Sequence, residues 1–241
     1  IYMMQQVGAN IDPTAMSYIP TFPMGHETAP GMGVIASSYM WKAGGISVNQ
    51  EGFRFANEND ADVVARETAL EEQTNAIQYD IFTDKIIEDT EALNASVFWN
   101  FYYAPGKPYN SDVVSADSLA VLAEKLGIDP ATFAATMETW NKAVADQKDD
   151  AFGRLSFASA LDTAPYYAIK VTAGVHHTMG GLKINTNTEV LKADGSVIPG
   201  LFAAGEVTGG VHGANRLGGN AVADFTVFGR IAGAAASKYA A

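Results

Sequence analysis

A glycine-rich stretch near the C-terminus, GEVTGGVHGANRLGGNAV, contains a single arginine, Arg216. Glycines let a ligand approach the backbone closely, and the N–H groups at a helix start bind anions. The stretch nevertheless lacks the P-loop pattern G-x-x-x-x-G-K-[ST], and no strand leads directly into G-x-G-x-x-G. An arginine in such a weakly charged setting is typical of bidentate carboxylate binding, and the alternative is a buried structural ion pair.

The four histidines all lie in unusual local sequence: His26, His176, His177 and His212. Two are adjacent, in GVHHTMGG, where the flanking glycines suggest side chains displayed at a strand end. A turn with one structural and one exposed histidine explains this motif equally well. Adjacent residues point to opposite sides of a strand, and no carboxylate pair is nearby, so a histidine-ligated metal is disfavoured.

Composition limits the classes of function. The chain has 241 residues, of which 48% are hydrophobic and 17% charged, which is typical of a globular protein with a core. Its net charge of −12 argues against a nucleic-acid partner. Without cysteine, this chain has no disulfide, thiolate catalyst, cysteine-ligated zinc or iron–sulfur cluster, or C-x-x-C-H haem motif. No apolar run approaches the length of a membrane span.

The elements that must position these residues follow from local patterns. Two helices are predicted at 115–127, ending at Gly127, and at 129–147, with Asp129 as N-cap and Pro130 in the first turn. A hairpin is expected at 46–56 and a helical, acidic segment at 61–82. Short strands follow from 166 to 205, and a helix of small residues closes the chain at about 220–239. The composition changes near 148–165, where we expect a domain boundary.

The segment HHTMGG and the later PGLFAAGEVTGGVHGANRLGGNAVADFTVFGR resemble the C-terminal signature of the fumarate reductase/succinate dehydrogenase flavoprotein superfamily. Soluble fumarate reductases and urocanate reductases within it are the most similar. The resemblance is strong over 166–241 and weaker over 1–165, where SVNQEGFRFANE fits. It implies an α/β FAD-binding domain of glutathione-reductase-like fold with an inserted α+β capping domain.

The resemblance also implies an organisation of the chain. Residues 1–21 would end the first FAD-domain segment, 22–157 would form the capping domain, and 158–241 would be the returning FAD-binding segment. The N-terminal dinucleotide-binding half would be missing from this chain. The chain also begins at Ile1 within a predicted helix, so we expect it to be the C-terminal part of a longer protein.

Site residues follow by matching positions. Arg216 would clamp a substrate carboxylate over the flavin, and His176 would hydrogen-bond the same substrate. FAD contacts would come from Gly205, Glu206, Gly219, Asn220, Ala221 and Val222. The resemblance also implies a monovalent cation held by main-chain oxygens, which here would belong to Thr178, Met179, Gly180, Glu206 and Thr208.

The reaction that the resemblance implies is hydride transfer from flavin N5 to the C=C bond of an α,β-unsaturated carboxylate. A cap arginine would protonate the other carbon, and ARET, Ala65–Thr68, matches the family's motif best, which makes Arg66 the candidate. An arginine is normally always charged, so this role needs a relay that returns the proton at once. The alternative is an exposed helix arginine that pairs with Glu67 or Asp62.

The chain departs from fumarate reductases at two cap segments. FPM at 22–24 stands where they have HPT, and SSYMWK at 37–42 stands where they have TEAVRG. The lining would then be apolar and aromatic, and its members are Phe22, Met24, Ser37, Ser38, Tyr39 and Trp41. An unpaired second carboxylate there would lose its hydration, so we expect a monocarboxylate with an apolar or aromatic tail rather than fumarate.

Several alternatives stay open at this point. The same departures would also suit a plain cap core, and the candidates to replace the lost proton relay are His26, Glu27 and Tyr39. The alternative identities are a true fumarate reductase, a ketosteroid-type flavin dehydrogenase and a non-catalytic fragment of such a flavoprotein. The expected partners are an unsaturated acid, the N-terminal half of the flavoprotein and an electron donor of unknown type. Either a cytoplasmic or an extracytoplasmic location is compatible.

Overall fold

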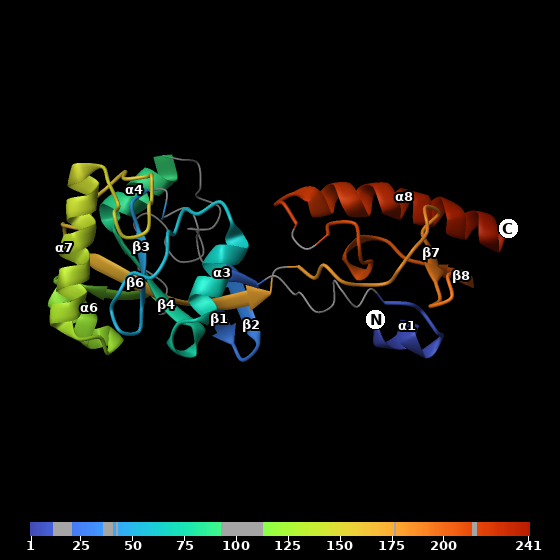
Figure 1. Ribbon diagram of the computed structural model, residues 1–241, viewed down its shortest axis with the longest axis horizontal. Helices are drawn as coiled ribbons and strands as arrows, with labels where there is room; N and C mark the ends of the chain where they lie inside the picture. The colour runs from blue at the N-terminus through green and yellow to red at the C-terminus, as the bar shows by residue number, and fades with distance from the viewer. Residues whose placement is uncertain (12–20, 36–40, 42, 93–112, 176, 214–215) are drawn as a thin grey trace. The chain divides into compact units, whose positions relative to one another are not determined.

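The computed structural model describes residues 1–11, 21–35, 41, 43–92, 113–175, 177–213 and 216–241 (Figure 1). These residues form two compact units. One is formed by Ile1–Thr21 with Val175–Ala241, and the other by Phe22–Gly174. The chain therefore leaves the first unit, builds the second and returns.

The unit of residues 22–174 is built on an antiparallel sheet. Its strands are β1 (Thr21–Ala29), β2 (Met32–Ile35), β3 (Ile46–Asn49), β4 (Ile77–Thr83), β5 (Val113–Ala116) and β6 (Tyr166–Val175). The order is β2-β1-β6-β4-β3, and β5 also pairs with β6. In this register Ser47 of β3 lies opposite Asp80 of β4, and Asp80 lies opposite Ile169 of β6.

Within the described residues of this unit the helices are α3 (Val63–Glu71), α4 (Asp84–Ala92), α6 (Leu119–Leu126) and α7 (Pro130–Asp146). The two predicted helices are confirmed, because their end signals are local. Ser118 caps α6 by accepting from the Val121 N–H at 3.3 Å, and Gly127 ends it in the left-handed region. Asp129 caps α7 by accepting from the Thr132 N–H at 2.8 Å.

The core of this unit lies between the α6–α7 pair and the strands. Phe133, Met137 and Trp140 of α7 are fully buried, and the apolar strand residues Ile46 and Val48 belong to the same cluster. The spacing of three and four residues along α7 puts its apolar side chains on one stripe, which explains why this helix packs inward there.

Two sequence-based expectations in this unit were wrong. The hairpin at 46–56 has only its first strand, which pairs with β4 instead, while Arg54 of the expected second strand forms a buried ion pair with Glu58. The segment 61–82 is helical only to Glu71. Asn75 then adopts a left-handed φ of 58°, and the alternating, β-favouring run at 77–83 forms β4.

The return to the other unit also differs from the expected position. Residues 158–174, predicted to belong to the FAD-binding segment, lie in the compact unit that ends at Gly174. The reason is β6, whose residues pair along their length with β4 and β5 of the cap-like sheet.

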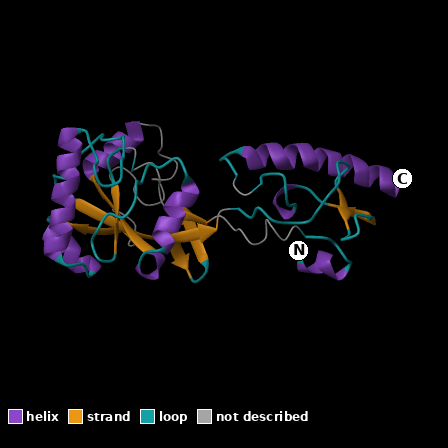
Figure 2. Cartoon of the chain, viewed as in Figure 1, coloured by secondary structure: helices purple, strands orange, loops and turns teal. Residues whose placement is uncertain are grey.

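The unit formed by the two ends of the chain contains less regular structure (Figure 2). Its elements are α1 (Tyr2–Gln6), β7 (Glu189–Leu191), β8 (Val197–Phe202), the 3-10 turn η2 (Gly205–Val207) and α8 (Asn220–Ala240). The predicted C-terminal helix is confirmed. A small core of Leu182, Val190 and Ala203 holds the unit together.

Candidate active site

The glycine-rich stretch forms two backbone corners that pack together. Gly205 begins η2 with φ of +76°, and a Cβ there would lie 3.3 Å from the Cβ of Phe225 on α8. Gly219 takes φ of +89° as the N-cap of α8, and no side chain caps that helix. A start without a side-chain cap carries partial positive charge, which suits an electron-rich ligand edge. The residues expected to contact FAD are Gly205, Glu206, Gly219, Asn220, Ala221 and Val222, and all lie at these two corners.

Glu206 joins η2 to the segment after the paired histidines. Its Oε1 accepts from the backbone N–H of Thr178 at 2.9 Å and from the Thr178 hydroxyl at 3.1 Å. Its Oε2 lies 3.4 Å from Nδ1 of His177. Burial alone would raise the pKa of Glu206, but the Thr178 hydrogen bonds and the nearby His177 and Arg216 lower it overall. The carboxylate is therefore ionised at neutral pH.

Backbone contact between these two segments is unusually close. A Cβ at Gly181 would lie 2.3 Å from the carbonyl oxygen of Val207, so only glycine fits there. The Leu182 N–H donates to that carbonyl at 2.8 Å, and the Gly209 N–H donates back to Leu182 at 3.1 Å. The expected cation ligands Thr178, Met179, Gly180, Glu206 and Thr208 all lie on these two adjoining segments.

Arg216 is a buried cation, with 8% of its surface exposed. Its Nη1 donates to the carbonyl of Leu217 at 3.3 Å, and its Nε has no hydrogen-bond acceptor among the described residues. The described part of the chain also gives it no carboxylate within ion-pair distance, so the internal ion pair considered above has no partner there. A buried guanidinium with free N–H groups is stabilised by an anionic ligand.

The histidine cluster is larger than the sequence indicated. His176, the predicted substrate ligand, lies outside the described residues. His177 is buried, and its ring meets that of His212 edge-on at 5.4 Å. Nε2 of His212 lies 3.2 Å from Oδ2 of Asp224, the buried residue of α8. His212 and Asp224 were not predicted as a pair, although a single acid in a helix of small residues was a usable signal.

Arg66 is tied to the second unit rather than extended into solvent. Asp62 caps α3 by accepting from Val64 N–H at 2.9 Å. The Nη1 of Arg66 donates to the carbonyl of Glu58 at 3.1 Å, and its guanidinium lies 5.3 Å from the centre of the Trp41 ring. Burial lowers the pKa of Arg66 below its ordinary range, although Asp60, Asp62 and Asp80 oppose the shift. Its guanidinium is thus closer to releasing a proton than an exposed one.

The Glu58 side chain is held by two arginines. It forms a bidentate pair with Arg54, at 2.8 and 2.9 Å, and a 3.1 Å ion pair with Arg154. Arg54 also pairs with Asp149 at 3.0 Å. Both guanidiniums lie on the ring of Trp140, at 4.6 and 4.5 Å from its centre. The network fixes the backbone carbonyl that holds Arg66.

The predicted substrate lining is described only in part. Phe22 and Met24 lie on β1, but their side chains, like all of Ser37, Ser38 and Tyr39, lie outside the described part of the structure. Trp41 is 2% exposed and belongs to the core cluster beneath Arg66.

The candidate relay residues are also only partly described. Glu27 accepts from the Gly31 N–H at 2.9 Å across the β1–β2 turn. The side chain of His26 and the whole of Tyr39 fall outside the described residues.

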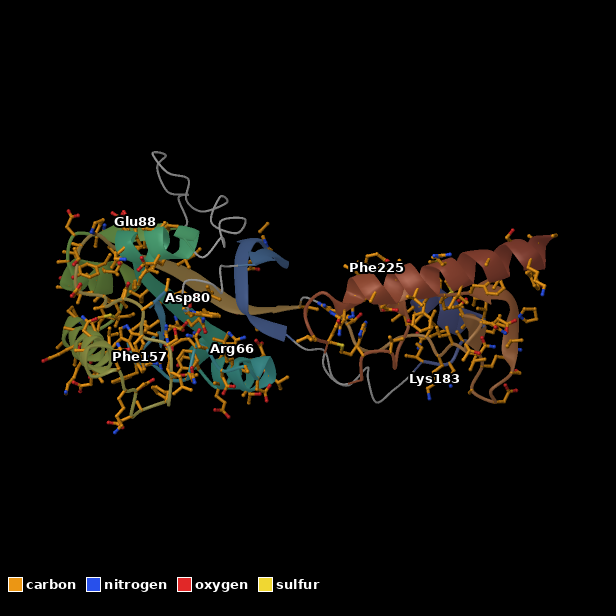
Figure 3. The ribbon with its side chains drawn as sticks, turned by 90° about the horizontal axis from the view of Figure 1, so that it is seen from above. Arg66, Asp80, Glu88, Phe157, Lys183 and Phe225 are labelled. Atoms are coloured by element: carbon orange, nitrogen blue, oxygen red, sulfur yellow. The ribbon has the colours of Figure 1, made fainter. Side chains whose placement is uncertain are left out.

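Three buried acids, Glu58, Asp80 and Asp224, were not predicted from the sequence, and Asp80, labelled in Figure 3, has no exposed surface. In the described part of the chain, no helix combines the length and apolarity that crossing a bilayer requires.

Comparison with known proteins agrees with this geometry. The family model described as FAD binding domain matches residues 1–222. A fumarate reductase (cytochrome) of Shewanella frigidimarina is 43% identical over 210 residues, which are 86% of this chain and 34% of that protein. A urocanate reductase of Eggerthella lenta is 36% identical over 239 residues, 99% of this chain and 38% of that protein.

A solved structure, the open conformation of a flavocytochrome c3 fumarate reductase, aligns with a TM-score of 0.81 at 35% identity. The alignment covers 99% of this chain and 39% of that one. The chain thus spans between a third and two fifths of the length of these three proteins.

Proposed function

The chain belongs to the FAD binding domain family, and we propose that it is the capping and C-terminal part of an FAD-dependent reductase. The reaction would be reduction of the C=C bond of an α,β-unsaturated carboxylate. The observation that carries the proposal is buried Arg216, whose Nε has no acceptor among the described residues, beside the glycine corners. A substrate carboxylate satisfies both the charge and the free N–H groups.

FAD would approach the backbone at Gly219, where an added Cβ would meet no atom within 4 Å, while Gly205 lets η2 pack closely against Phe225 of α8. Gly205 and Glu206, with Gly219, Asn220, Ala221 and Val222, would hold it. When bound and reduced, FAD would supply the hydride to one alkene carbon. The positive end of α8 would stabilise negative charge beside its first turn.

Each side chain then has one task. Arg216 binds and orients the carboxylate, and His176 donates a second hydrogen bond to it. Arg66 gives a guanidinium proton to the alkene carbon that does not receive the hydride, and then regains one from a relay. The main-chain oxygens of Thr178, Met179, Gly180, Glu206 and Thr208 would hold a monovalent cation that steadies the two adjoining segments.

We favour a monocarboxylate with an apolar or aromatic tail as the substrate. Phe22 and Met24 offer no group to pair with a second carboxylate, and desolvating an unpaired one is costly. Ser37, Ser38, Tyr39 and Trp41 would complete the lining. Urocanate, the acid in the name of one relative, has one carboxylate and an aromatic ring.

The test uses the complete FAD-loaded protein. Its reduced flavin should be reoxidised rapidly by cinnamate-type acids and slowly by fumarate, and Arg66→Ala should abolish turnover without loss of flavin. Rapid reoxidation by fumarate would establish the second candidate, a true fumarate reductase, which the 43% identity to such an enzyme favours. If no α,β-unsaturated carboxylate reoxidised the reduced flavin, the remaining alternatives would be a ketosteroid-type dehydrogenase and a non-catalytic fragment.

The remainder of the flavoprotein is the first proposed partner. Large apolar side chains on and before α8 are more than half exposed in this chain: Leu217, Val222, Phe225 and Val227. A dinucleotide-binding half packed on this helix would cover them. A separate electron donor would complete the system.

A further inference from the structure

Asp80 is an acid enclosed within the sheet of the second unit. It lies on β4 opposite Ser47 and has no exposed surface. Its Oδ1 accepts from the Ser47 hydroxyl and from Gln78 Nε2, both at 2.7 Å. Its Oδ2 is buried and has no hydrogen-bond partner among the described residues. Burying a carboxyl oxygen without a hydrogen-bond partner costs free energy, so such a group calls for an explanation such as a function.

The polar groups around Asp80 lead toward Arg66. Ser47 Oγ accepts from the indole N–H of Trp41 at 3.1 Å, and Arg66 lies over that indole ring. A cavity of about 20 Å³ is lined by Ser47, Gln78, Trp41 and Arg66, among others. That volume suffices for one water molecule. Figure 3 labels Arg66 and Asp80, which come from α3 and from β4, the strand that α3 packs against.

Asp80 can hold a proton at neutral pH. Burial raises its pKa to about 7, with nearby Glu58 adding to the rise and the Ser47, Gln78 and Trp41 hydrogen bonds opposing it. The charges that face it are Glu58, itself paired with Arg54 and Arg154, and the Arg66 guanidinium of α3. Another acid of α3, Glu67, is buried too, and β6 contributes only apolar Ile169 at the paired position.

We propose that Asp80 stores the proton that recharges Arg66 after each reduction, acting through the Ser47 hydroxyl and a water in the cavity. This rests on the proposed function. Arg66 loses one N–H proton to the substrate carbon and becomes neutral. The Asp80 carboxyl then gives its O–H proton to Ser47 Oγ, while the hydroxyl proton that pointed at Asp80 turns and passes to the water. The water in turn gives a proton to the Arg66 nitrogen.

The carboxylate that remains takes a proton from solvent. One solvent proton is consumed per product, and no electrons move in the relay. Asp80 touches neither substrate nor FAD in this scheme, so it is a positioning residue and not a catalytic one.

The first test is Asp80→Asn in the complete FAD-loaded protein. Asparagine keeps the Oδ1 acceptor but carries no transferable carboxyl proton. Since the protonated acid is the donor, kcat of the wild type should fall as pH rises through about 7. Asp80→Asn should lower kcat about ten-fold to a hundred-fold and remove that pH dependence, with KM and flavin content unchanged. Asp150→Asn, at an exposed Lys148–Asp150 pair, is the matched control and should behave as wild type.

A second variant tests the role of Asp80 even if Asp80→Asn folds poorly. Gln78→Leu removes a hydrogen bond that favours the ionised carboxyl, so the fall in kcat should move to higher pH. Infrared titration without substrate gives a readout independent of turnover. The protonated carboxyl band should disappear near pH 7 in the wild type and be absent from Asp80→Asn.

The outcomes distinguish a failure of the proposed function from a failure of the role given to Asp80. A wild-type protein that reduces no enoate overturns the proposed function. An active wild type, an inactive Arg66→Ala and an Asp80→Asn variant with unchanged kcat and pH profile would overturn only the role of Asp80. An unshifted pH profile in Gln78→Leu would do the same.

Discussion

The Nη1 of Arg66 donates to the backbone carbonyl of Glu58 at 3.1 Å, while the Glu58 carboxylate is held by Arg54 and Arg154. Glu58 thus holds Arg66, the proposed proton donor, through its main-chain carbonyl, and its side chain binds the buried Arg54 and Arg154. The position of Arg66 depends on an ion-pair network that does not itself touch substrate.

Replacing Glu58 by Gln should therefore cost both stability and rate. Two buried guanidiniums would lose their shared carboxylate, and breaking a buried pair by removing one partner costs about 3–5 kcal/mol. Urea unfolding of the chain should show the loss. Lys85→Ala removes an exposed pair with Asp89 and should change the free energy of unfolding by less than about 1 kcal/mol. Equal effects of the two variants would contradict the role given to Glu58.

Arg216→Gln should weaken the use of unsaturated acids. Truncating one partner of a buried, hydrogen-bonded charge pair costs about 2–5 kcal/mol, so kcat/KM should fall by at least about thirty-fold. Steady-state kinetics with the complete flavoprotein measures it. Lys142→Gln, at an exposed Lys142–Asp146 pair on α7, is the matched control and should leave kcat/KM unchanged. A normal kcat/KM in Arg216→Gln would remove the basis of the proposed clamp.

Gly181→Ala should disrupt the close contact between residues 178–182 and residues 205–209. The new Cβ would lie 2.3 Å from the Val207 carbonyl oxygen, and this backbone atom can move only with the η2 turn. We expect a lower melting temperature and loss of bound flavin on gel filtration. Gly233→Ala, within α8 and free of contacts, should instead be neutral or stabilising by up to about 1 kcal/mol. Full flavin retention in Gly181→Ala would show that the close approach is dispensable.

Glu206 should make stability depend on pH. Its folded pKa lies below the ordinary value of 4.5, so its contribution is present above that value and is lost as pH falls through the folded pKa. The difference in unfolding free energy between wild type and Glu206→Gln should be largest near neutral pH and shrink in acid. If this difference in unfolding free energy stayed constant over about four pH units, from about pH 3 to about pH 7, the hydrogen bonds from Thr178 would not depend on the charge of Glu206.

The sequence predicted those parts of the fold whose causes are local. Helices α6 and α7 begin and end with Ser118, Gly127 and Asp129, residues that act on their own backbone. The strand pairing was missed, because the partner of β3 is β4 and the run after Gly52 gives no sign of it. β6 was predicted as a strand, but its partners were not, since only the pairing reveals its neighbours.

The site divides in the same way. Arg216 and the glycine corners were recognisable from composition and resemblance. Asp80 was not, because an acid in an alternating strand ordinarily faces solvent. Its burial comes from Trp41 and from α3, which other parts of the chain supply. The His212–Asp224 pair likewise joins residues from a loop and a helix.

Trp140 lies on α7, a helix that contributes no proposed site residue, yet both arginines that hold Glu58 rest on its ring. A screen for inactive mutants should therefore find substitutions on α7. Such hits would resemble long-range communication between distant parts of the protein. The structure gives a simpler cause. The Trp140 ring supports both arginines that hold Glu58, so its loss would let Arg66, the proposed proton donor, shift without any transition between two conformational states.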